Sequence, residues 1–507
     1  MLMFKKTVLS LSCAAALVAG VAPAFAASSF FLVVPIPTAA KAPVESAITV
    51  SLAGATLPKA KLGKAYSESL RTYLSVTGDA TFDPSVASWH LANGSLPAGL
   101  ALGVDGTITG TPSALTSDSG SSFEVVATYK SKSGQQVYTI RVGSAVLNAV
   151  QISMGHNHAC AVTTEGAAKC WGSNASGQLG DGTNGFRSLT PVQVVGLESG
   201  VTAISAGAMT AYSHTCAIQA GALKCWGQNA QGQLGDGTTT DRRTPAVVSG
   251  LGSGVTAVST GYTTNCALQS GGVKCWGINE YGQVGDGTNE NRTTPVAVAG
   301  MGSGVTYLAS AGGTHNCAIQ AGALKCWGRN SYGQLGDGTN THRNTPVGVI
   351  GLGSGVISVV GGTSHTCSLQ TFQNSGQGVL CWGANSVGQL GDAFMVDTAS
   401  EPTPVIGLMA GVTALSGTAN HNCAIQAGAL KCWGSNSSGQ LGDGSTVNSA
   451  TPWAVPGLSS GVTAVAAGQA STCVLQNSEA KCWGANNWGQ LGTGYITTSM
   501  VPVNVAE

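Results

Sequence analysis

Cysteine spacing is the strongest sign of chemistry in this sequence. Of 15 cysteines, Cys13 lies in an apolar N-terminal segment and the other 14 fall into seven close pairs. Structural zinc sites use Cys-x₂₋₄-Cys spacing and redox dithiols use Cys-x-x-Cys, and these pairs have neither. An even cysteine count in an exported chain favours disulfides, with reduced structural thiols and a metal or redox role as the alternatives. The pairs are Cys160 with Cys170, Cys216 with Cys225, Cys266 with Cys275, Cys317 with Cys326, Cys367 with Cys381, Cys423 with Cys432, and Cys473 with Cys482.

The residues between paired cysteines indicate a β-hairpin. In the stretch CAIQAGALKC, which begins at Cys216, a two-residue Ala-Gly turn places the two cysteines directly opposite each other. Counting outward from the turn gives them a non-hydrogen-bonded position, where Cα atoms lie about 4.5 Å apart, near the short end of disulfide geometry. In the first and fifth pairs the additional residues lengthen only the turn, so the cysteines still face each other. We therefore expect seven cross-strand disulfides.

A glycine-rich phrase, GQLGDGT, recurs with small variations after each cysteine pair. A phosphate-binding loop would need a Gly-Lys-Ser/Thr ending at a strand-to-helix turn. A calcium site would need more than one carboxylate per loop to supply about six to eight ligands. We interpret the phrase as tight turns closed by a local Asx hydrogen bond.

An arginine follows the aspartate of this phrase by six residues in the first four repeats. One interpretation is an ion pair that closes the loop and contributes little stability at the surface. The alternative is a basic arc on one face, suited to an acidic partner. The pairs are Asp181 with Arg187, Asp236 with Arg242, Asp286 with Arg292, and Asp337 with Arg343.

A histidine lies two positions before the first cysteine in five repeats, where equivalent side chains could ring a channel and bind metal. Two repeats carry Thr264 and Ser471 at this position, so we interpret the histidines as structural and expect neither a metal nor a cofactor. His156 next to His158 would add only a two-ligand His-x-His pair. The five residues are His158, His214, His315, His365 and His421.

The N-terminus, residues 1–26, has the pattern of a secretory signal peptide. Two lysines precede an apolar run that closes with Ala24-Phe25-Ala26, the small residues a signal peptidase requires. A lipoprotein anchored through Cys13 is the alternative, although the preceding residues fit a lipobox poorly. An apolar, proline-bearing linker is expected over residues 27–47.

Charge is sparse and balanced along the chain. Charged residues make up 9% of the sequence, with 22 basic and 22 acidic side chains, so the chain lacks the basic footprint of a nucleic-acid-binding protein. No later segment has the roughly 18 apolar residues of a membrane span. We expect a monomer that is secreted, periplasmic or held at the cell surface, without nucleic acid and without a transmembrane span.

The region from 48 to 146 contains strand-like alternation in FEVVATY and VYTIRV. Ahead of these strands, LPAGLALGVDGTITGTP at residues 96–112 resembles the bacterial immunoglobulin-like domains whose hallmark is Leu-Pro-x-Gly-Leu followed by Gly-x-Ile-x-Gly-Thr-Pro. The resemblance covers about one domain. It implies a β-sandwich that serves as an exposed spacer or adhesive module.

From residue 147 to 507 the sequence repeats with a period near 50, which indicates a propeller or solenoid. Short apolar stretches alternate with glycine turns, so the expected class is all-β. The phrases WGQNAQGQLG and WGRNSYGQLG, each preceded by a histidine, resemble the regulator-of-chromosome-condensation repeats. This resemblance implies a seven-bladed β-propeller of four-stranded blades. We expect its seven repeat tryptophans in the core, and the solitary Trp453 and Trp488 are better surface-site candidates.

Function is expected where the repeats differ, because no asymmetric catalytic constellation can be singled out. We expect a non-catalytic recognition or adhesion scaffold that binds a protein or cell-surface ligand through variable loops, including residues 393–397. The resemblance implies guanine-nucleotide exchange as one alternative, and secreted enzyme inhibition as another. The candidate partner-binding residues are Arg187, Arg242, Arg292, Arg343, Phe394, Met395 and Tyr495.

Overall fold

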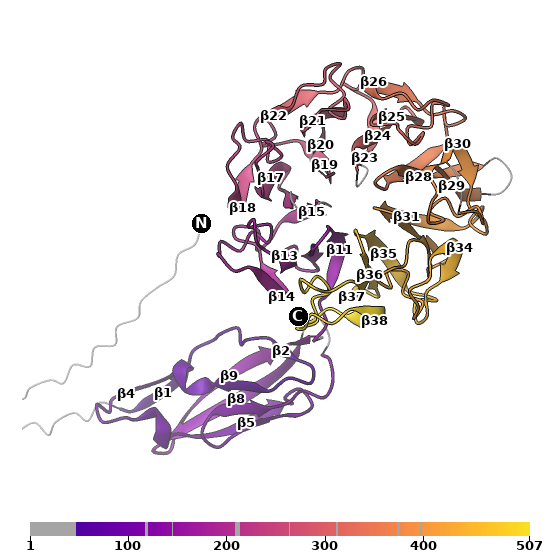
Figure 1. Ribbon diagram of the computed structural model, residues 1–507. Coiled ribbons are helices and arrows are strands. Elements are labelled where there is room, and N and C mark those ends of the chain that lie inside the picture. The colour runs from indigo at the N-terminus through magenta and orange to yellow at the C-terminus, as the bar shows by residue number, and fades with distance from the viewer. Residues whose placement is uncertain are drawn as a thin grey trace, which may run out of the picture.

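The computed structural model describes residues 47–116, 120–143, 145–207, 213–262, 264–310, 313–372, 376–395 and 398–507. The predicted signal peptide and almost all of the predicted linker lie outside these residues, as do Val396 and Asp397 of the predicted binding loop. The described part of the chain forms a β-sandwich and a ring of seven four-stranded sheets (Figure 1).

The N-terminal domain is an immunoglobulin-like sandwich of short sheets with two 3-10 turns, η1 (Leu70–Tyr73) and η2 (Pro84–Val86). The longest pairing joins β8 and β9, the two strands expected from sequence, and β8 buries every second residue against the core. Phe123, Ile108 and Tyr138 lie at the centre of that core. The strands are β1 (Thr49–Leu52), β2 (Ala60–Lys61), β3 (Tyr66–Ser69), β4 (Leu74–Thr77), β5 (Ser88–Gly94), β6 (Leu100–Leu102), β7 (Thr107–Gly110), β8 (Ser121–Tyr129), β9 (Lys132–Ile140) and β10 (Val142–Gly143).

The glycines of the hallmark phrase allow close backbone and ring contacts in this sandwich. Gly106 has a φ of +81° and lies against the indole of Trp89, so a Cβ atom there would overlap the ring. Gly99 and Gly110 also have positive φ, and each lies so close to its neighbouring backbone that a side chain would overlap it. The phrase therefore marks positions where the fold excludes side chains.

The propeller consists of seven antiparallel sheets, and the four strands of each sheet, here called A to D from the centre outward, are consecutive in sequence. Blades 1 to 3 are β11 (Ala149–Met154), β12 (His158–Thr163), β13 (Ala168–Ser173), β14 (Arg187–Gln193); β15 (Val201–Ala206), β16 (His214–Gln219), β17 (Ala222–Gly227), β18 (Arg242–Val247); and β19 (Val255–Thr260), β20 (Thr264–Gln269), β21 (Gly272–Gly277), β22 (Arg292–Ala297).

Blades 4 to 7 follow the same plan. They are β23 (Val305–Ser310), β24 (His315–Gln320), β25 (Ala323–Gly328), β26 (Arg343–Gly348); β27 (Val356–Gly361), β28 (His365–Phe372), β29 (Gly376–Ala384), β30 (Thr398–Pro404); β31 (Val412–Thr418), β32 (His421–Gln426), β33 (Ala429–Gly434), β34 (Ser449–Ala454); and β35 (Val462–Ala467), β36 (Ser471–Gln476), β37 (Glu479–Gly484), β38 (Ser499–Asn504).

Each cysteine pair joins strands B and C of one blade. Cys216 lies directly opposite Cys225 across the Ala220-Gly221 turn, the register expected from the sequence, and the six other pairs face each other in the same way. All seven pairs are disulfide-bonded in the structure, with Cα atoms 4.0–4.1 Å apart. The half-cystines are buried, so they add to the apolar packing between blades. The bonds join Cys160 to Cys170, Cys216 to Cys225, Cys266 to Cys275, Cys317 to Cys326, Cys367 to Cys381, Cys423 to Cys432, and Cys473 to Cys482.

The repeat tryptophans connect neighbouring blades, and the prediction that they belong to the core is confirmed. Every one is fully buried. Its indole Nε1 donates to the backbone oxygen of the glutamine in the preceding blade's GQLG phrase, at 2.9–3.1 Å, as from Trp226 to Gln178. Tryptophan and glutamine recur together because the two residues form one contact between blades.

The ring closes between blades 7 and 1 without a shared strand. The segment 145–149, which leads out of the sandwich, performs this closure by bridging Val146 to Ala506 and Asn148 to Glu479. The carbonyl of Leu147 accepts from the amide of Ala480 at 2.9 Å, as the carbonyl of a connector leucine, or of Met301 in blade 3, does within the other blades. The segment that leaves the sandwich therefore adds contacts to the closure of the propeller, beside the Trp171–Gln490 hydrogen bond that also joins blades 1 and 7.

No helix among the described residues is long and apolar enough to cross a membrane.

Candidate functional site

The loops between strands C and D form a continuous ring on one end of the propeller. Each loop is hydrogen-bonded to strand D of the next blade. The donor is the backbone amide of the residue after the loop aspartate (after Thr493 in blade 7), and the acceptor is a strand D carbonyl, as from Gly182 to Arg243 at 3.1 Å. Strands in a blade are antiparallel, so the B–C hairpins leave from the opposite end. The variable residues of seven loops are thereby held next to one another on one face.

A recurring frame of asparagine and aspartate side chains fixes the loops of blades 1 to 6, and the asparagine recurs without the aspartate in blade 7. In blade 2, Asp236 Oδ1 accepts from the amide and hydroxyl of Thr238, at 2.9 and 2.7 Å. Asn229 bridges the loop from inside, since its Nδ2 donates to Thr238 and its Oδ1 accepts from the Leu234 amide at 2.9 Å. The predicted Asx turns are confirmed, and the buried asparagine is a loop-organising residue that the sequence reasoning missed. Its signal was its constant position three residues after each Cys-Trp.

Three of the four arginines are held by these aspartates. In blade 2, Nε and Nη2 of Arg242 lie 2.7 and 2.6 Å from Asp236 Oδ2, and Arg292 and Arg343 make the same contact with their own aspartates. Burial would raise the pKa of the Asp236 carboxyl, but hydrogen bonds from Thr238 and Arg242 outweigh it and hold the pKa below its usual range. The loop-closing ion pair is confirmed in blades 2 to 4, where a local carboxylate neutralises each arginine.

Blade 1 departs from this pattern, and the ion pair expected between Asp181 and Arg187 is wrong. Asp181 binds Thr183, while Nη1 of Arg187 donates to the Asn487 backbone oxygen of blade 7 at 3.1 Å. The arginine is directed toward blade 7 instead of its own loop, so it reinforces the contact at the ring closure.

Apolar side chains project from the loops of blades 5 to 7. Phe394 is 62% exposed and Tyr495 64%, and Met395 is also exposed. The frame beneath persists, since the Phe394 amide donates to Asp392 Oδ1 at 3.1 Å and Asn486 Nδ2 donates to the Tyr495 carbonyl at 2.8 Å. Polar groups of these loops point inward and the large apolar groups point to solvent.

Further exposed apolar residues on this face were missed by the sequence reasoning. Val447 is 71% exposed in blade 6, and Ile496 lies beside Tyr495 in blade 7. Phe186 of blade 1 is exposed and packs on Trp488 of blade 7, with ring centroids 5.2 Å apart. The sequence could have revealed Phe186, Val447 and Ile496, because each is apolar at a loop position that is polar in blades 2 to 4. The other solitary tryptophan, Trp453, is exposed on the outer strand of blade 6.

The five histidines bind neighbouring blades. In His158 the Nε2–H donates to Thr215 Oγ1 at 2.9 Å, because that hydroxyl already donates its own proton to the Gln178 carbonyl. Burial lowers the pKa of His158, His315 and His421 to about 3 and that of His365 to about 4. Among the described residues there is no group of three or more His, Cys, Asp or Glu placed to hold a metal.

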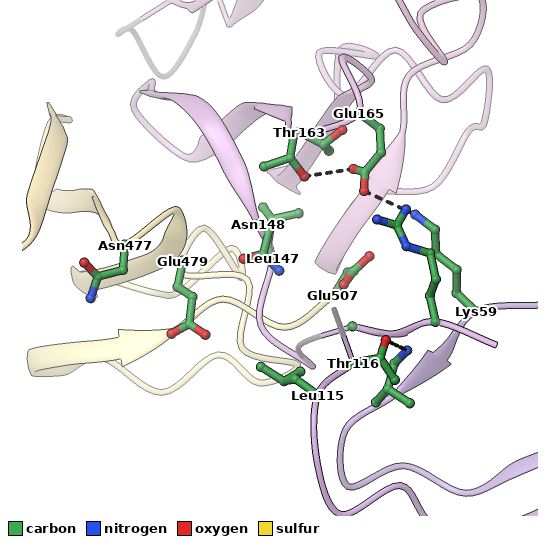
Figure 2. A pocket seen from close by; sticks show the side chains of 14 residues that line it. Lys59, Leu115, Thr116, Leu147, Asn148, Thr163, Glu165, Asn477, Glu479 and Glu507 are labelled. Atoms are coloured by element: carbon green, nitrogen blue, oxygen red, sulfur yellow. Dashed lines mark hydrogen bonds and ion pairs between the residues drawn. The ribbon is translucent and has the colours of Figure 1, made fainter. Parts of the chain in front are cut away.

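A cleft of about 450 Å³ lies between the sandwich and the B–C hairpins of blades 1 and 7 (Figure 2). Lys59 and Arg141 line it from the sandwich, and Glu165, Glu479 and Glu507 from the propeller. Lys59 Nζ lies 3.2 Å from Glu165 Oε1, but both side chains are more than half exposed, so this link contributes little stability. The sandwich thus contacts the end of the propeller opposite the C–D loops.

Comparisons with known proteins agree with this architecture. The Putative Ig domain family matches residues 32–143, and the RCC1-like domain family matches residues 115–473. The ultraviolet-B receptor UVR8 of Arabidopsis thaliana is 29% identical over 253 residues, which is 49% of this chain and 56% of the receptor. The human E3 ubiquitin-protein ligase HERC2 is 29% identical over 307 residues, 59% of this chain and 5% of the ligase. The chain thus covers little more than half of the first relative and a small part of the second.

Solved structures show the same fold at low sequence identity. Prp20p from Saccharomyces cerevisiae superposes with a TM-score of 0.59 at 20% identity, covering 72% of this chain and 88% of Prp20p. Human WBSCR16 superposes with a TM-score of 0.57 at 21% identity, covering 66% of this chain and 93% of that one. The family match spans more than half of the chain, and the strand order and the interlocking Trp and Gln residues fit it. This chain therefore belongs to the RCC1-like domain family.

Proposed function

We propose that this chain is an exported, non-catalytic scaffold that binds a protein or surface partner through the C–D loops of its propeller. The observation that carries the proposal is the set of large apolar side chains, including Phe394 and Tyr495, held in solvent by hydrogen-bonded loops. Exposed aromatic side chains on a fixed frame supply contact area at a low entropic cost, as in protein interfaces.

Relatives support protein recognition as the class of function. Prp20p is described by its binding properties to Gsp1p and histones, and a structure shows it bound to Kap60. Export is supported by the signal-peptide pattern of residues 1–26 and by seven cysteine pairs in disulfide geometry, because disulfides persist mainly in oxidising compartments. The sandwich attached to the opposite end suits a spacer that presents the loop face.

A loop swap between blades 3 and 5 tests this proposal. Residues 393–396 are replaced by Gly-Thr-Asn-Glu, the equivalent loop of blade 3 (residues 287–290), and the variant is used in pull-downs from culture medium and cell envelope. We expect the partner recovered by the unaltered protein to be lost or strongly reduced. Unchanged recovery of every specific partner would refute binding through this loop.

Nucleotide release separates the exchange alternative implied by the family. An exchange factor would accelerate release of bound guanine nucleotide from a GTPase, whereas a scaffold of the proposed kind leaves the release rate unchanged. Acceleration by the purified chain would refute the non-catalytic assignment.

A further inference from the structure

The C–D loop ring divides into two halves of different chemistry. In blades 2 to 4 the loops carry the Asp-Arg pairs and polar tips such as Thr240, Glu290 and Thr341, all exposed, together with one exposed aromatic side chain, Tyr332 of blade 4. In blades 5, 6, 7 and 1 the exposed side chains include several large apolar ones. We call these residues the apolar arc: Phe186, Phe394, Met395, Val447, Tyr495 and Ile496.

The four loops of the apolar arc are joined to one another by backbone hydrogen bonds. Ala393 of blade 5 donates to Ala450 of blade 6 at 3.0 Å, and Gly444 of blade 6 donates to Met500 of blade 7 at 3.0 Å. Gly494 of blade 7 completes the series by donating to Leu189 of blade 1 at 2.9 Å. The apolar side chains are therefore placed on adjacent, mutually fixed loops and belong to one surface.

Charge distinguishes this surface from the rest of the ring. The C–D segments 384–404, 435–456 and 485–506 contain no lysine or arginine, and the last of them contains no charged residue. Asp392 and Asp443 in these segments are occupied by loop hydrogen bonds. The C–D segments of the ring carry six arginines. Arg242, Arg292 and Arg343 are neutralised by their own aspartates, whereas Arg187, Arg243 and Arg329 donate to backbone or hydroxyl oxygens. Apart from Arg187 of blade 1, the C–D segments that carry the apolar arc therefore offer no basic side chain to an acidic partner.

We infer that the apolar arc binds an uncharged, aromatic- or aliphatic-rich segment of another protein, with Phe186, Phe394 and Tyr495 as the principal contacts. Charge matching favours such a segment, because a charged one would lose its hydration here without gaining a counter-charge. A glycan is less suited, since the amides of Asn385 and Asn486 are directed to loop carbonyls and away from the exposed rings. This inference rests on the proposed function and adds the partner's chemistry and the half of the ring that binds it.

Selection from a phage-displayed library of random peptides tests the inference on the full chain. Enriched peptides are expected to be uncharged and rich in aromatic and aliphatic residues. Their binding should change less than about twofold between roughly 0.05 and 0.5 M NaCl, because apolar contacts are not screened by salt. The arc variant F186S/F394S/Y495S should weaken binding at least about tenfold.

A matched control variant changes the same face outside the apolar arc. T240A/E290A/T341A alters exposed loop tips of blades 2 to 4, and it should bind the selected peptides as the unaltered protein does. Equal melting temperatures of both variants and the unaltered protein establish that folding is preserved.

Other outcomes overturn the inference in distinguishable ways. Enrichment of acidic peptides that dissociate in salt would refute the partner's chemistry and leave the proposed function standing. A concentration-dependent dimer abolished by F186S/F394S/Y495S would identify a second copy as the occupant, and glycan-array binding abolished by that variant would identify a carbohydrate. If no peptides were enriched while the 393–396 loop swap abolished partner capture, the partner chemistry alone would be wrong. Failure of both experiments would refute the proposed function as well.

Discussion

Leu147 provides a direct test of how the propeller ring is closed. This leucine leaves the sandwich in the segment 145–149 and is buried in the core shared by blades 7 and 1, beside Val505 and Leu491. Its carbonyl accepts from the Ala480 amide, the contact that Leu251 makes with Leu223 between strands of an internal blade. At Leu251 a continuous connector also joins blades 2 and 3. At Leu147 the ring depends on noncovalent contacts between residues far apart in the chain.

The substitution Leu147→Ala should lower the free energy of opening at this closure. Replacing a fully buried leucine by alanine costs about 2.7–5 kcal/mol when the cavity does not collapse. Taking about 3 kcal/mol, because the site lies at the domain boundary and can relax, the opening equilibrium should rise roughly a hundredfold. The disulfides lie within blades, so they do not oppose this opening.

Hydrogen exchange measured by mass spectrometry on peptides covering 145–151, 477–484 and 499–507 reports the opening. The amides of Ala149, Ala480 and Glu507 should exchange up to about a hundredfold faster in Leu147→Ala, because each bonds across the closure. The control Leu251→Ala removes an equally buried side chain but should change these amides by less than about threefold. Equal acceleration in both variants would refute the reasoning, since closure would then not depend on Leu147.

Three further predictions concern residues of the repeats. The free energy of unfolding should fall as the pH drops below about 6.5, because burial lowers the pKa of His158, His315, His365 and His421 and the unfolded chain therefore binds more protons. Near pH 5 each histidine contributes a loss of up to about 2 kcal/mol, which urea unfolding measures. A flat stability profile from pH 7 to 5 would contradict this. Non-reducing mass spectrometry should find seven intra-blade disulfides, and fewer bridges would contradict the assignment. The double substitution Cys216→Ala and Cys225→Ala should lower the free energy of unfolding by up to about 2.7 kcal/mol, the chain-entropy value for a sequence separation of 9. Asp236→Asn should increase proteolysis of the 236–243 loop, because Arg242 loses the carboxylate that holds it. Asp181→Asn should not increase proteolysis of the blade 1 loop in this way, because Arg187 stays bound to Asn487. Equal sensitivity of the two loops to protease would count against distinct roles for the two arginines.

The repeating parts of the fold were predictable from sequence because each is decided locally. A two-residue turn sets the register of the hairpin that pairs Cys216 with Cys225, and the period near 50 indicates one blade per repeat. The Asx turn at Asp236 likewise depends on neighbours two residues away. Such contacts span a few residues, so residue types and spacing are sufficient to predict them.

The candidate site was predictable only in part. Phe394 and Tyr495 were identifiable because they interrupt a polar loop pattern, but the contact of Phe186 with Trp488 joins residues about three hundred positions apart. Arg187 had the same sequence spacing as Arg242, yet the ring brings Asn487 within its reach and the two arginines bind different partners. Closure of the ring therefore decides whether such an arginine binds its own aspartate or a residue of the neighbouring blade.

By itself, the sequence determined the strand pattern, the facing of the cysteines and the number of blades, because these depend on the local periodicity of the chain. Only the tertiary structure decided that Arg187 binds blade 7 instead of Asp181, that segment 145–149 joins blade 7 at the ring closure, and that the apolar loop residues share one half of a face. Each of these depends on distances between residues far apart in sequence, and those distances are set by the curvature of seven packed sheets.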